Sequence, residues 1–570
     1  MADAMSTTQR PDMVGSLGGT LAGVAGMGAT ATGALQPRSM LDLRPEGVAS
    51  EKSLGVSCRS GREMIQIQVG KAGCGIGHEF LRDLVEEHQI EYRGDELRGT
   101  FFGQDFALEQ HLDVFFNEGA PHKASGRNRW VPRCLLVDLN MQDLAQITSG
   151  PLGHLYRPEN LIGTDEGSGN CYATARRQAS PIIMDTVEDI VRKEAEKSNC
   201  LQGIQFTHSI IGGTGSGLTS LILSELHDYF DGNVMLQSFT LFPGPNFCDM
   251  VVEPYNATLA MKELMEYCEQ VFVYDNAALS NICQKSLRSA VPKRQEMNNI
   301  VALCMSGITS GMRFKGPLNA DIWKMNQNLV PFKGLHFLCS SFAPLNSEQS
   351  GPYRMKSVLD LAQQMLQKDN YTCTCDPLAN IQGKAPETID GKPPARVLAS
   401  WASWRGSFKT QEVDRILYDM SRPGSRFDNL YPDWIPNPIA TNVCAQGHCN
   451  ARDSVVYVTN NTRVTEVFEH MMSCFDKLFS TKSFVHNYKN DGVEESDMFS
   501  ARRALDSLKA DYDSRAKKGD KIYKGEACNP KAKVDPSMLT KDEVELAKLV
   551  LQYSKELFWA EQDEPRKEKR

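Results

Sequence analysis

Apolar and polar positions alternate along the chain in an order typical of α/β proteins. Residues 63–69 alternate as a strand does, and residues 78–88 repeat apolar side chains at helical spacing. A buried strand is predicted over 204–211, followed by a helix over 218–230, and the apolar run 133–138 ends in an acidic residue. Strands that alternate with helices predict a parallel sheet covered by helices.

Loops rich in glycine and small polar residues follow the predicted strands. They cover Gly70–Gly77, Thr164–Asn170 and Gly212–Gly217. Small residues let backbone amides approach an anion, and a helix that begins near Ile76 turns its positive end toward it. The first loop alone is equally typical of a plain strand-to-helix turn, and the third is no Walker loop because no Gly-Lys-Ser/Thr follows. Since parallel strands end at one edge of a sheet, the loops together predict one polyphosphate site.

The composition limits the number of domains and the kinds of partner that the chain can have. At about 150 residues per domain, 570 residues allow two to four domains. The 62 basic and 71 acidic side chains give a net charge of −9, which argues against a general binder of nucleic-acid backbones. The 16 cysteines are scattered without the paired spacing of a zinc site, and nothing resembles a secretory signal. We expect reduced thiols in a cytosolic protein.

The first 61 residues differ in composition from the rest. Residues 13–36 carry no charge and are about as long as a membrane span. Gly, Thr and Ser dilute their apolar content, and Leu17, Leu21 and Val24 are the larger apolar side chains. A flexible, disordered low-complexity extension over 1–61 is therefore favoured over a membrane segment, and no membrane is expected.

The loop Gly212–Gly217, GGTGSG, resembles the signature loop of the tubulins. Six further segments resemble tubulin segments in the same order: VPRCLLVDL (Val131–Leu139), CDMVVEPYNATL (Cys248–Leu259), YDNAAL (Tyr274–Leu279), GPLNADIWKMNQNLVPF (Gly316–Phe332), LHFLCSSFAPL (Leu335–Leu345) and DWIPN (Asp433–Asn437). The resemblance covers roughly residues 62 to 510 and is nearer to β-tubulin than to α-tubulin.

The resemblance implies an α/β fold in several parts. A Rossmann-like GTPase domain with a parallel sheet is expected over 62–275, and a core helix region over 276–298. A smaller α/β second domain follows over 299–500, with an inserted loop near 382–396. Residues 501–570 are expected to form C-terminal helices and a basic tail, where tubulins carry a glutamate-rich run.

The resemblance also implies a site for GTP or GDP. Its phosphate-loop positions are occupied here by Gly70, Lys71, Ala72, Ser209, Gly212, Gly213, Thr214 and Gly215. Asn170 matches an amide near the terminal phosphate, and Asp249 and Glu253 match ribose contacts. Asn276 and Asn298 match amides at the guanine edge, where a side chain that both donates and accepts discriminates guanine from adenine.

Some positions depart from the tubulin pattern. Lys71 replaces a Gln, and its ammonium group could neutralise phosphate charge in place of a metal. Asn140 replaces a carboxylate that helps to hold magnesium, although Asp138 remains as a ligand through water. Arg294 replaces a Tyr that stacks on the base, which a guanidinium group can also do. The other departures are Gly75 for a second Gln and Ile211 for the first glycine of the signature. We expect a working pocket with weakened Mg²⁺ binding.

In tubulins, the next subunit completes hydrolysis by inserting an acidic loop against the phosphates. The matching loop here is Gly316–Lys324, in which Asn319 and Asp321 agree with the family. Lys324 stands where α-tubulin has Glu, and a lysine cannot act there as a carboxylate base. The chain is therefore not expected to trigger hydrolysis in a neighbour. Asp321 remains the candidate catalytic residue toward the neighbouring nucleotide, although alone it is also typical of a helix N-terminus.

The first functional hypothesis is a β-like subunit that assembles head to tail with α-tubulin or other tubulins in microtubules. A partner subunit would complete the hydrolysis of its nucleotide. The departures from the tubulin pattern favour a minor type of tubulin in the cytoplasmic cytoskeleton, in the basal body, centriole or axoneme. The alternative is a non-polymerising, nucleotide-stabilised adaptor or capping protein. An NAD-type dehydrogenase is disfavoured because no GxGxxG follows the first strand.

Overall fold

The structure is a computed structural model, and its described residues fall in ranges separated by short gaps. These are 62–93, 98–103, 106–109, 111–121, 126–179, 182–244, 250–318, 321–345, 357–375, 395–422, 430–432, 435, 437–448 and 453–516. The predicted extension at 1–61, most of the inserted loop at 382–396, and the tail beyond 516 lie outside the described residues. So do Asp249 and Asn319.

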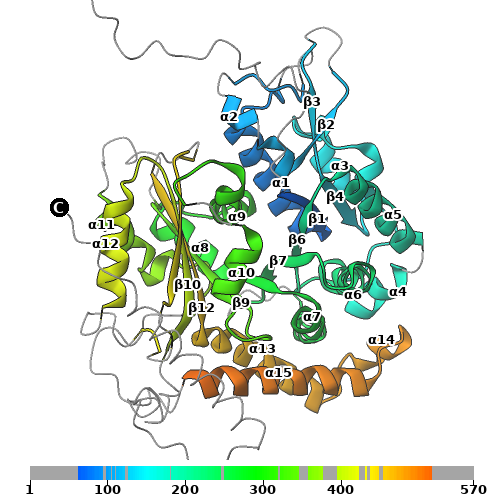
Figure 1. Ribbon diagram of the computed structural model, residues 1–570. Helices are drawn as coiled ribbons and strands as arrows, with labels where there is room; N and C mark the ends of the chain where they lie inside the picture. The colour runs from blue at the N-terminus through cyan, green and yellow to red at the C-terminus, as the bar shows by residue number, and fades with distance from the viewer. Residues whose placement is uncertain are drawn as a thin grey trace, which may run out of the picture. The chain divides into compact units, whose positions relative to one another are not determined.

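Ten described strands form one mostly parallel sheet (Figure 1). They are β1 (Glu63–Val69), β4 (Cys134–Asp138), β5 (Leu161–Gly163), β6 (Leu201–Ser209), β7 (Met235–Phe242), β8 (Gln270–Asp275), β9 (Phe337–Ala343), β10 (Val397–Arg405), β11 (Ile439–Cys444) and β12 (Ser454–Asn461). Their order is β11-β10-β12-β9-β8-β7-β6-β1-β4-β5, and only β12 runs antiparallel to its neighbours. A separate hairpin pairs β2 (Phe116–Gly119) with β3 (Arg129–Pro132). The α/β class predicted from the sequence is confirmed.

Helices cover both faces of the sheet. One face carries α1 (Gly70–Glu87), α3 (Met141–Thr148), α8 (Asn276–Lys285), α9 (Arg294–Arg313) and α10 (Ile322–Leu329), with the short α2 (Phe106–Glu109). The other carries α4 (Tyr172–Gln178), α5 (Ile182–Lys197), α6 (Thr219–Phe230), α7 (Glu253–Tyr267), α11 (Val358–Met365), α12 (Thr410–Ser421), α13 (Thr465–Ser480), α14 (Val485–Asn490) and α15 (Glu495–Ala516). Along β4, Leu135 and Val137 enter one core and Cys134 and Leu136 the other, because successive strand side chains point to opposite faces.

The first predicted glycine loop is helical. The sequence placed the helix start near Ile76, whereas α1 begins at Gly70 directly after β1. Gly70 has a φ of +72°, which lets the chain turn from strand to helix without a loop. A Cβ atom on Gly73 would lie 2.0 Å from the carbonyl oxygen of Thr207, so this glycine permits the close packing of α1 on β6.

The predicted boundaries of the central helices also differ from the structure. The core helix region predicted at 276–298 contains the separate helix α8 and only the start of α9, which continues to Arg313. A glycine inside α9 permits close packing on the sheet, because a Cβ atom on Gly307 would lie 2.1 Å from Val456 Cγ2. The C-terminal helices begin at Thr465, within the range predicted for the second domain. The two predicted domains share one sheet through the β8–β9 pairing.

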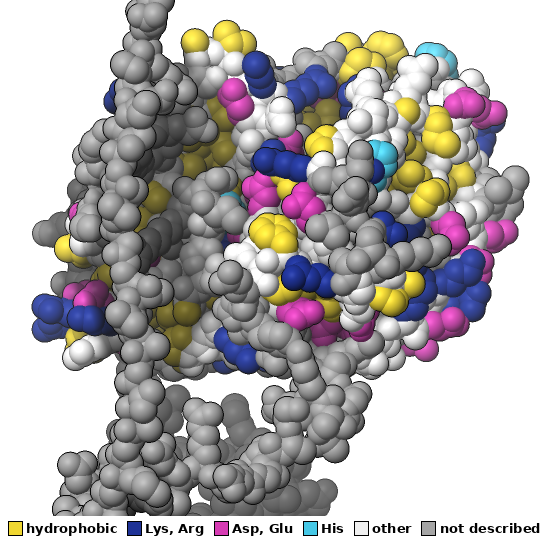
Figure 2. All heavy atoms as spheres, turned by 90° about the horizontal axis from the view of Figure 1, so that it is seen from above, with side chains coloured by type: hydrophobic (Ala, Val, Ile, Leu, Met, Phe, Trp, Pro, Cys, Tyr) yellow, Lys and Arg dark blue, Asp and Glu magenta, His cyan; other side chains and the backbone are white. Residues whose placement is uncertain are grey.

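The described surface mixes charges of both signs. On the face seen in Figure 2, Lys and Arg side chains are interspersed with Asp and Glu. Among the described residues, no helix combines the length and the apolar character that a membrane crossing requires.

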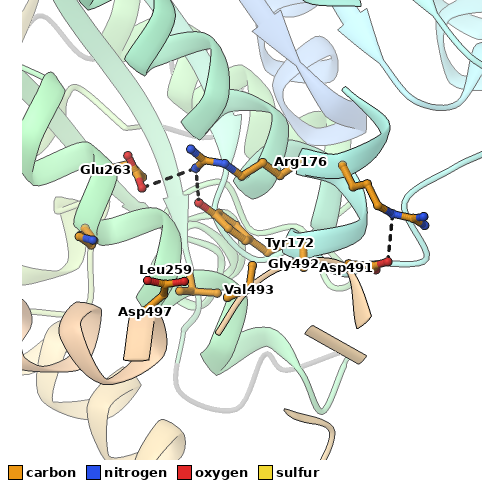
Figure 3. Close-up of a pocket in the computed structure, with 11 residues that line it drawn as sticks. Tyr172, Arg176, Leu259, Glu263, Asp491, Gly492, Val493 and Asp497 are labelled. Carbon is orange, nitrogen blue, oxygen red and sulfur yellow. Dashed lines mark hydrogen bonds and ion pairs between the residues drawn. The ribbon is translucent and has the colours of Figure 1, made fainter. Parts of the chain in front are cut away.

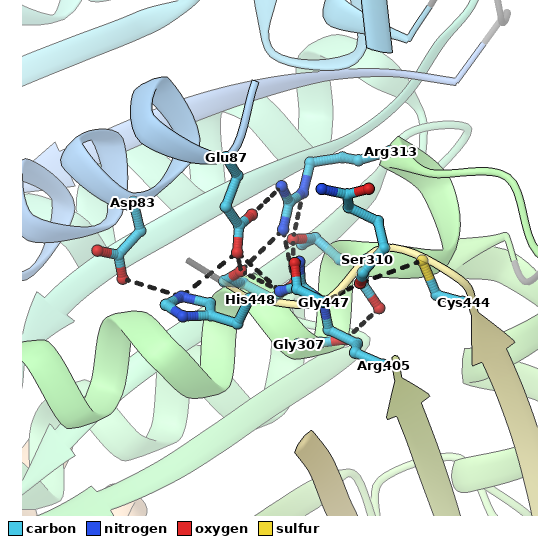
Figure 4. A network of polar contacts seen from close by, with 12 residues as sticks. Asp83, Glu87, Gly307, Ser310, Arg313, Arg405, Cys444, Gly447 and His448 are labelled. Carbon is cyan, nitrogen blue, oxygen red and sulfur yellow. Dashed lines mark hydrogen bonds and ion pairs between the residues drawn. The ribbon is translucent and has the colours of Figure 1, made fainter. Parts of the chain in front are cut away.

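A buried carboxylate joins α1, α9 and β10 (Figure 4). Glu87 on α1 lies 2.5 Å from Nη1 of Arg313 on α9 and 2.8 Å from Nη1 of Arg405 on β10. Ser306 donates a hydrogen bond of 2.7 Å to the same carboxylate, and Nε2 of His448 lies 3.3 Å away. Burial alone would raise the pKa of Glu87, but the guanidinium groups outweigh it and hold that pKa well below its usual range. The network therefore ties three elements together through one ionised group.

We predict that Glu87→Gln destabilises the protein strongly. Two guanidinium groups would stay buried without a counter-charge, at an expected cost of about 3–5 kcal/mol in the free energy of unfolding. Chemical denaturation of the purified chain measures this loss. The matched control is Glu196→Gln, which breaks an exposed pair with Arg192 on α5 and should cost less than about 1 kcal/mol. Equal losses in the two variants would contradict the assigned role of Glu87.

A second prediction concerns pH. Burial raises the pKa of Asp83 to about 7; Arg82 opposes this shift, and Glu87 and Glu79 add to it. In the unfolded chain the same carboxyl group has a pKa of about 3.9. Between about pH 3.9 and 7, the folded state therefore keeps this proton, whereas the unfolded chain has lost it. Stability should fall as the pH rises through that range, by at most about 1.4 kcal/mol per pH unit, and level off above it. The Asp83→Asn variant should lack this contribution, so unfolding curves from about pH 5 to 8 should show a shallower decline than wild type. Parallel pH profiles would refute this.

Candidate functional site

The predicted site residues gather at the carboxyl ends of the parallel strands. Gly70 follows β1, Asp138 ends β4, Ser209 ends β6 and Asn276 follows β8. Because β1 pairs in parallel with β4 and β6, and the parallel pairing continues through β7 to β8, these ends share one edge of the sheet. Ligands of open α/β sheets bind at this edge.

The signature glycines lead into a π-helical turn, η5 (Thr214–Leu218), which continues into α6. A Cβ atom on Gly215 would lie 2.5 Å from the carbonyl oxygen of Ser209, and one on Gly213 would lie 2.6 Å from the amide nitrogen of Cys171. Neither position can carry a side chain, whereas nothing lies within 4 Å of a Cβ atom on Gly212. The turn thus leaves backbone close to open space, as an anion site needs.

A buried histidine supports the same turn. Nδ1 of His208 lies 2.9 Å from the carbonyl oxygen of Gly215, and its Nε2 lies 2.9 Å from the hydroxyl of Ser238. Burial lowers the pKa of His208 to about 4, so the ring is neutral at physiological pH. His208 fixes the loop and adds no charge to the site.

The three predicted loops meet. A Cβ atom on Gly70 would lie 3.2 Å from the amide nitrogen of Gly215, which places the start of α1 against the signature turn. The hydroxyl of Ser168, in the middle loop, lies 3.1 Å from that of Thr214. Asn170 ends the middle loop with a φ of +56°. Ser168 was not among the site residues predicted from the sequence, although its place in a loop of small residues could have indicated it.

Asn256 on α7 connects these loops, although the sequence gave it no role beyond a matching segment. Its Nδ2 donates to the carbonyl oxygens of Asn170 (2.8 Å) and Ile211 (3.1 Å). Its Oδ1 accepts from the amide of Tyr172 (2.9 Å) and from the hydroxyl of Tyr488 (2.7 Å). The side chain is fully buried, so these bonds are not shared with bulk water. A polar residue within an apolar helical run is the signal that sequence analysis could have used.

One corner of the site holds charged groups. Nζ of Lys71 lies 2.8 Å from Oδ1 of Asp143 on α3, and Asn140 donates a hydrogen bond of 3.0 Å to Oδ2 of the same carboxylate. Oδ1 of Asp138 accepts from the amide of Asn140 at 3.2 Å, while its Oδ2 accepts no hydrogen bond from the described residues. Burial raises the pKa of Asp138 to about 6. Asp143, the partner of the lysine that replaces a Gln, was not among the predicted site residues.

Residues expected at the base and ribose lie on neighbouring helix starts. A Cβ atom on Gly75 would lie 3.0 Å from Nδ2 of Asn298, so the first turns of α9 touch α1. Arg294 begins α9 and is exposed, and Asn276 begins α8 behind the capping carboxylate of Asp275. Ala72 is partly buried in α1. Glu253 begins α7 and accepts a 2.8 Å hydrogen bond from the amide of Met250.

Asp321 lies away from these loops. It precedes α10, and its Oδ1 lies 2.7 Å from Nε of Arg62, the residue before β1. Gly70 follows the other end of the same strand, so Asp321 lies toward the opposite edge of the sheet, about 20 Å away for a seven-residue strand. Lys324 is exposed on α10.

A cavity of about 530 Å³ lies beside α4, between α7 and the segment joining α14 to α15 (Figure 3). Both arginines that line it are paired with carboxylates: Arg176 lies 3.5 Å from Glu263, and Arg177 lies 3.0 Å from Asp491. These guanidinium groups already have counter-charges, so the glycine loops fit a polyphosphate better than this cavity does.

Two protein-family models match the chain. The one described as Tubulin/FtsZ family, GTPase domain, matches residues 63–284, from β1 to the last turn of α8. The one described as Tubulin C-terminal domain matches residues 334–473, from β9 into α13. The first range contains all three loops that meet at the sheet edge.

We predict that Asn256→Ala loosens the loops around the site. The variant removes the bonds to the carbonyl groups of Asn170 and Ile211, to the amide of Tyr172 and to the buried hydroxyl of Tyr488. Each of these groups that stays buried without a partner costs about 1–3 kcal/mol. Hydrogen exchange should accelerate in the segments around Asn170 and Ile211. Thr258→Ala is the control on the same helix, since it removes only an intrahelical bond to the carbonyl of Pro254. Unchanged protection of both segments in Asn256→Ala would show that the amide does not hold them.

Proposed function

The chain belongs to the Tubulin/FtsZ family, and on this premise we propose that it is a cytoskeletal subunit that assembles head to tail with α-tubulin or another tubulin in microtubules. The family establishes a tubulin-like, GTP-binding protein. The proposal adds the mode of assembly and the division of the hydrolytic chemistry between subunits.

The observation that carries the proposal is the separation of two functional ends. The glycine loops lie at the carboxyl edge of the sheet, and Asp321 lies toward the opposite edge beside Arg62. A head-to-tail contact would bring α10 of one subunit toward the glycine loops of the next. This heterologous geometry generates a filament when the contact does not close.

The chain's own residues would hold the nucleotide in three ways. Backbone amides at the starts of α1 and α6 would bind the phosphates, with Gly213 and Gly215 making room. Asn276 and Asn298 would donate to and accept from the guanine edge. The nucleotide itself supplies the phosphoanhydride bond that is broken in hydrolysis.

The charged groups around Lys71, Asn140 and Asp143 support the proposal that nucleotide binding depends less on Mg²⁺ in this chain. Asn140 caps α3 through its Oδ1, which accepts from the amide of Gln142, and it carries no negative charge for a metal. Lys71 brings a cation to the start of α1, within reach of Asp143. Asp138 would be the remaining carboxylate for a hydrated metal. We infer that Lys71 takes over part of the charge neutralisation on the phosphates.

Hydrolysis would be completed by a partner. A base that orients water must be a proton acceptor, and the exposed Lys324 brings no carboxylate to that position. An α-like neighbour that offers a carboxylate against the glycine loops would supply the missing group. The same argument makes this chain a poor activator of the nucleotide in the next subunit.

One observation favours the alternative, a non-polymerising adaptor or capping protein. The ion pair with Arg62 holds Asp321 within its own chain, and this pair would have to open before Asp321 could face another subunit. Co-sedimentation with αβ-tubulin polymer distinguishes the two functions. Incorporation along the length supports the subunit, whereas persistent exclusion supports the adaptor. Immunolocalisation tests the proposed basal-body, centriole or axoneme association.

We predict that the purified, denatured chain releases about one GTP or GDP per molecule, identified by chromatography, and that chelating Mg²⁺ during purification removes less than half of it. Lys71→Gln should make retention depend on Mg²⁺, because the ammonium near the phosphates is lost. The control is Lys193→Gln, which breaks an exposed pair with Asp189 on α5. A folded, nucleotide-free wild type would refute binding, and equal retention in Lys71→Gln and wild type after chelation would refute the role of Lys71.

A further inference from the structure

Three buried thiols converge beside the base side of the site. Cys339 lies on β9, and Cys373 and Cys375 follow the short helix η7 (Lys368–Asn370). Sγ of Cys375 lies 3.5 Å from Sγ of Cys339 and 2.9 Å from Sγ of Cys373. All three sulfur atoms lie within 4.8 Å of one another, and each residue is at most 3% exposed. The sequence showed only scattered cysteines, because one ligand comes from a separate strand.

Backbone pairing brings the three residues together. The amide of Thr372 donates to the carbonyl of Ser340, next to Cys339, at 3.0 Å. The carbonyl of Thr372 in turn accepts from the amide of Asp275, at the end of β8, also at 3.0 Å. The segment that carries Cys373 and Cys375 is thus held against both β8 and β9. These backbone hydrogen bonds bring the three cysteines together without any ligand.

The sulfur separations suit a metal ion. Ligands at the usual metal–sulfur distance of about 2.3 Å would lie about 3.8–4.0 Å apart, so shifts of about 1 Å or less would complete such a site. The hydrogen bonds among the three thiols shift their pKa values in both directions, and burial raises the pKa of each, so that each lies well above its ordinary value. A bound cation would displace the protons and offset the buried thiolate charge. Among the described residues, no fourth His, Cys, Asp or Glu joins the cluster.

We propose that Cys339, Cys373 and Cys375 bind one thiophilic d¹⁰ cation, Zn²⁺ or Cu⁺. Thiolates select these soft ions; a three-sulfur set suits three-coordinate Cu⁺, and Zn²⁺ would take one additional donor. The ion would cross-link β9 to the segment that hydrogen-bonds Asp275. Asp275 caps α8, whose first residue is Asn276, so the metal would brace the helix that faces the guanine edge.

The test is the metal content of the full-length chain. Protein purified without chelators or a histidine tag is reduced, reconstituted anaerobically with Zn²⁺ or Cu⁺ in separate arms, desalted and analysed by mass spectrometry of the elements. We expect about one ion per chain in one of the arms, and a loss of most of it in Cys373→Ala and Cys339→Ala. Cys268→Ala, another buried cysteine outside the cluster, should keep the wild-type content.

A second readout covers variants that fail to fold. Co²⁺ added to the reduced wild type should give sulfur-to-cobalt charge-transfer absorption, which Zn²⁺ or Cu⁺ should abolish by displacement. Folded wild type that binds no Zn²⁺ or Cu⁺ in either arm would overturn the proposal, as would equal metal content in Cys373→Ala and Cys268→Ala. The nucleotide content of the same samples is a separate measurement, so the two proposals succeed or fail independently.

Discussion

The arrangement of the sheet and its central helices depends on the buried ion pairs between the carboxylate of Glu87 and the guanidinium groups of Arg313 and Arg405. Glu87 lies at the end of α1, while its partners come from the end of α9 and the end of β10. The glycine-rich start of α1 forms part of the predicted nucleotide site. Its other end is held by Arg405, which lies in the range matched by the tubulin C-terminal domain, and by Arg313, which lies between the two matched ranges. A fully buried ion network costs desolvation, and it persists only when every member is paired. A change in the spacing of α1, α9 and β10 would therefore shift α1 and, with it, the glycine residues at its start.

The site itself depends on close backbone approach more than on special side chains. Gly70, Gly213 and Gly215 stand where a Cβ atom would collide with neighbouring backbone or come too close to it. Asn256 then fixes the resulting loops through carbonyl and amide groups, and His208 supports the signature turn as a neutral ring. Phosphate recognition of this kind relies on the fixed dipoles of helix starts. An exchange such as Ile211 for a glycine leaves these donors in place, since the backbone supplies them.

The charged corner combines two departures from the tubulin pattern with a carboxylate on α3. A neutral Asn140 stands in place of a carboxylate, but Asp143 brings a carboxylate one helical turn later, and Lys71 pairs with it. Under the proposed function, the ammonium group of Lys71 would supply part of the positive charge that a divalent metal otherwise brings. Asp138 stays buried beside it, with burial raising its pKa. Electrostatic balance in the corner is therefore set by three residues from β4, α1 and α3 together.

The sequence by itself determined the α/β class, the order of the glycine loops and their common edge, because hydrophobic period and small-residue loops are local features. The resemblance carried by GGTGSG and the other segments predicted the family. The tertiary structure decided what depends on distant segments. It set the start of α1 at Gly70, the partners of Lys71 and Glu87, the role of Asn256, and the meeting of Cys339 with Cys373 and Cys375. Local periodicity carries no information about which buried polar groups meet, since those partners are fixed only when strands and helices pack.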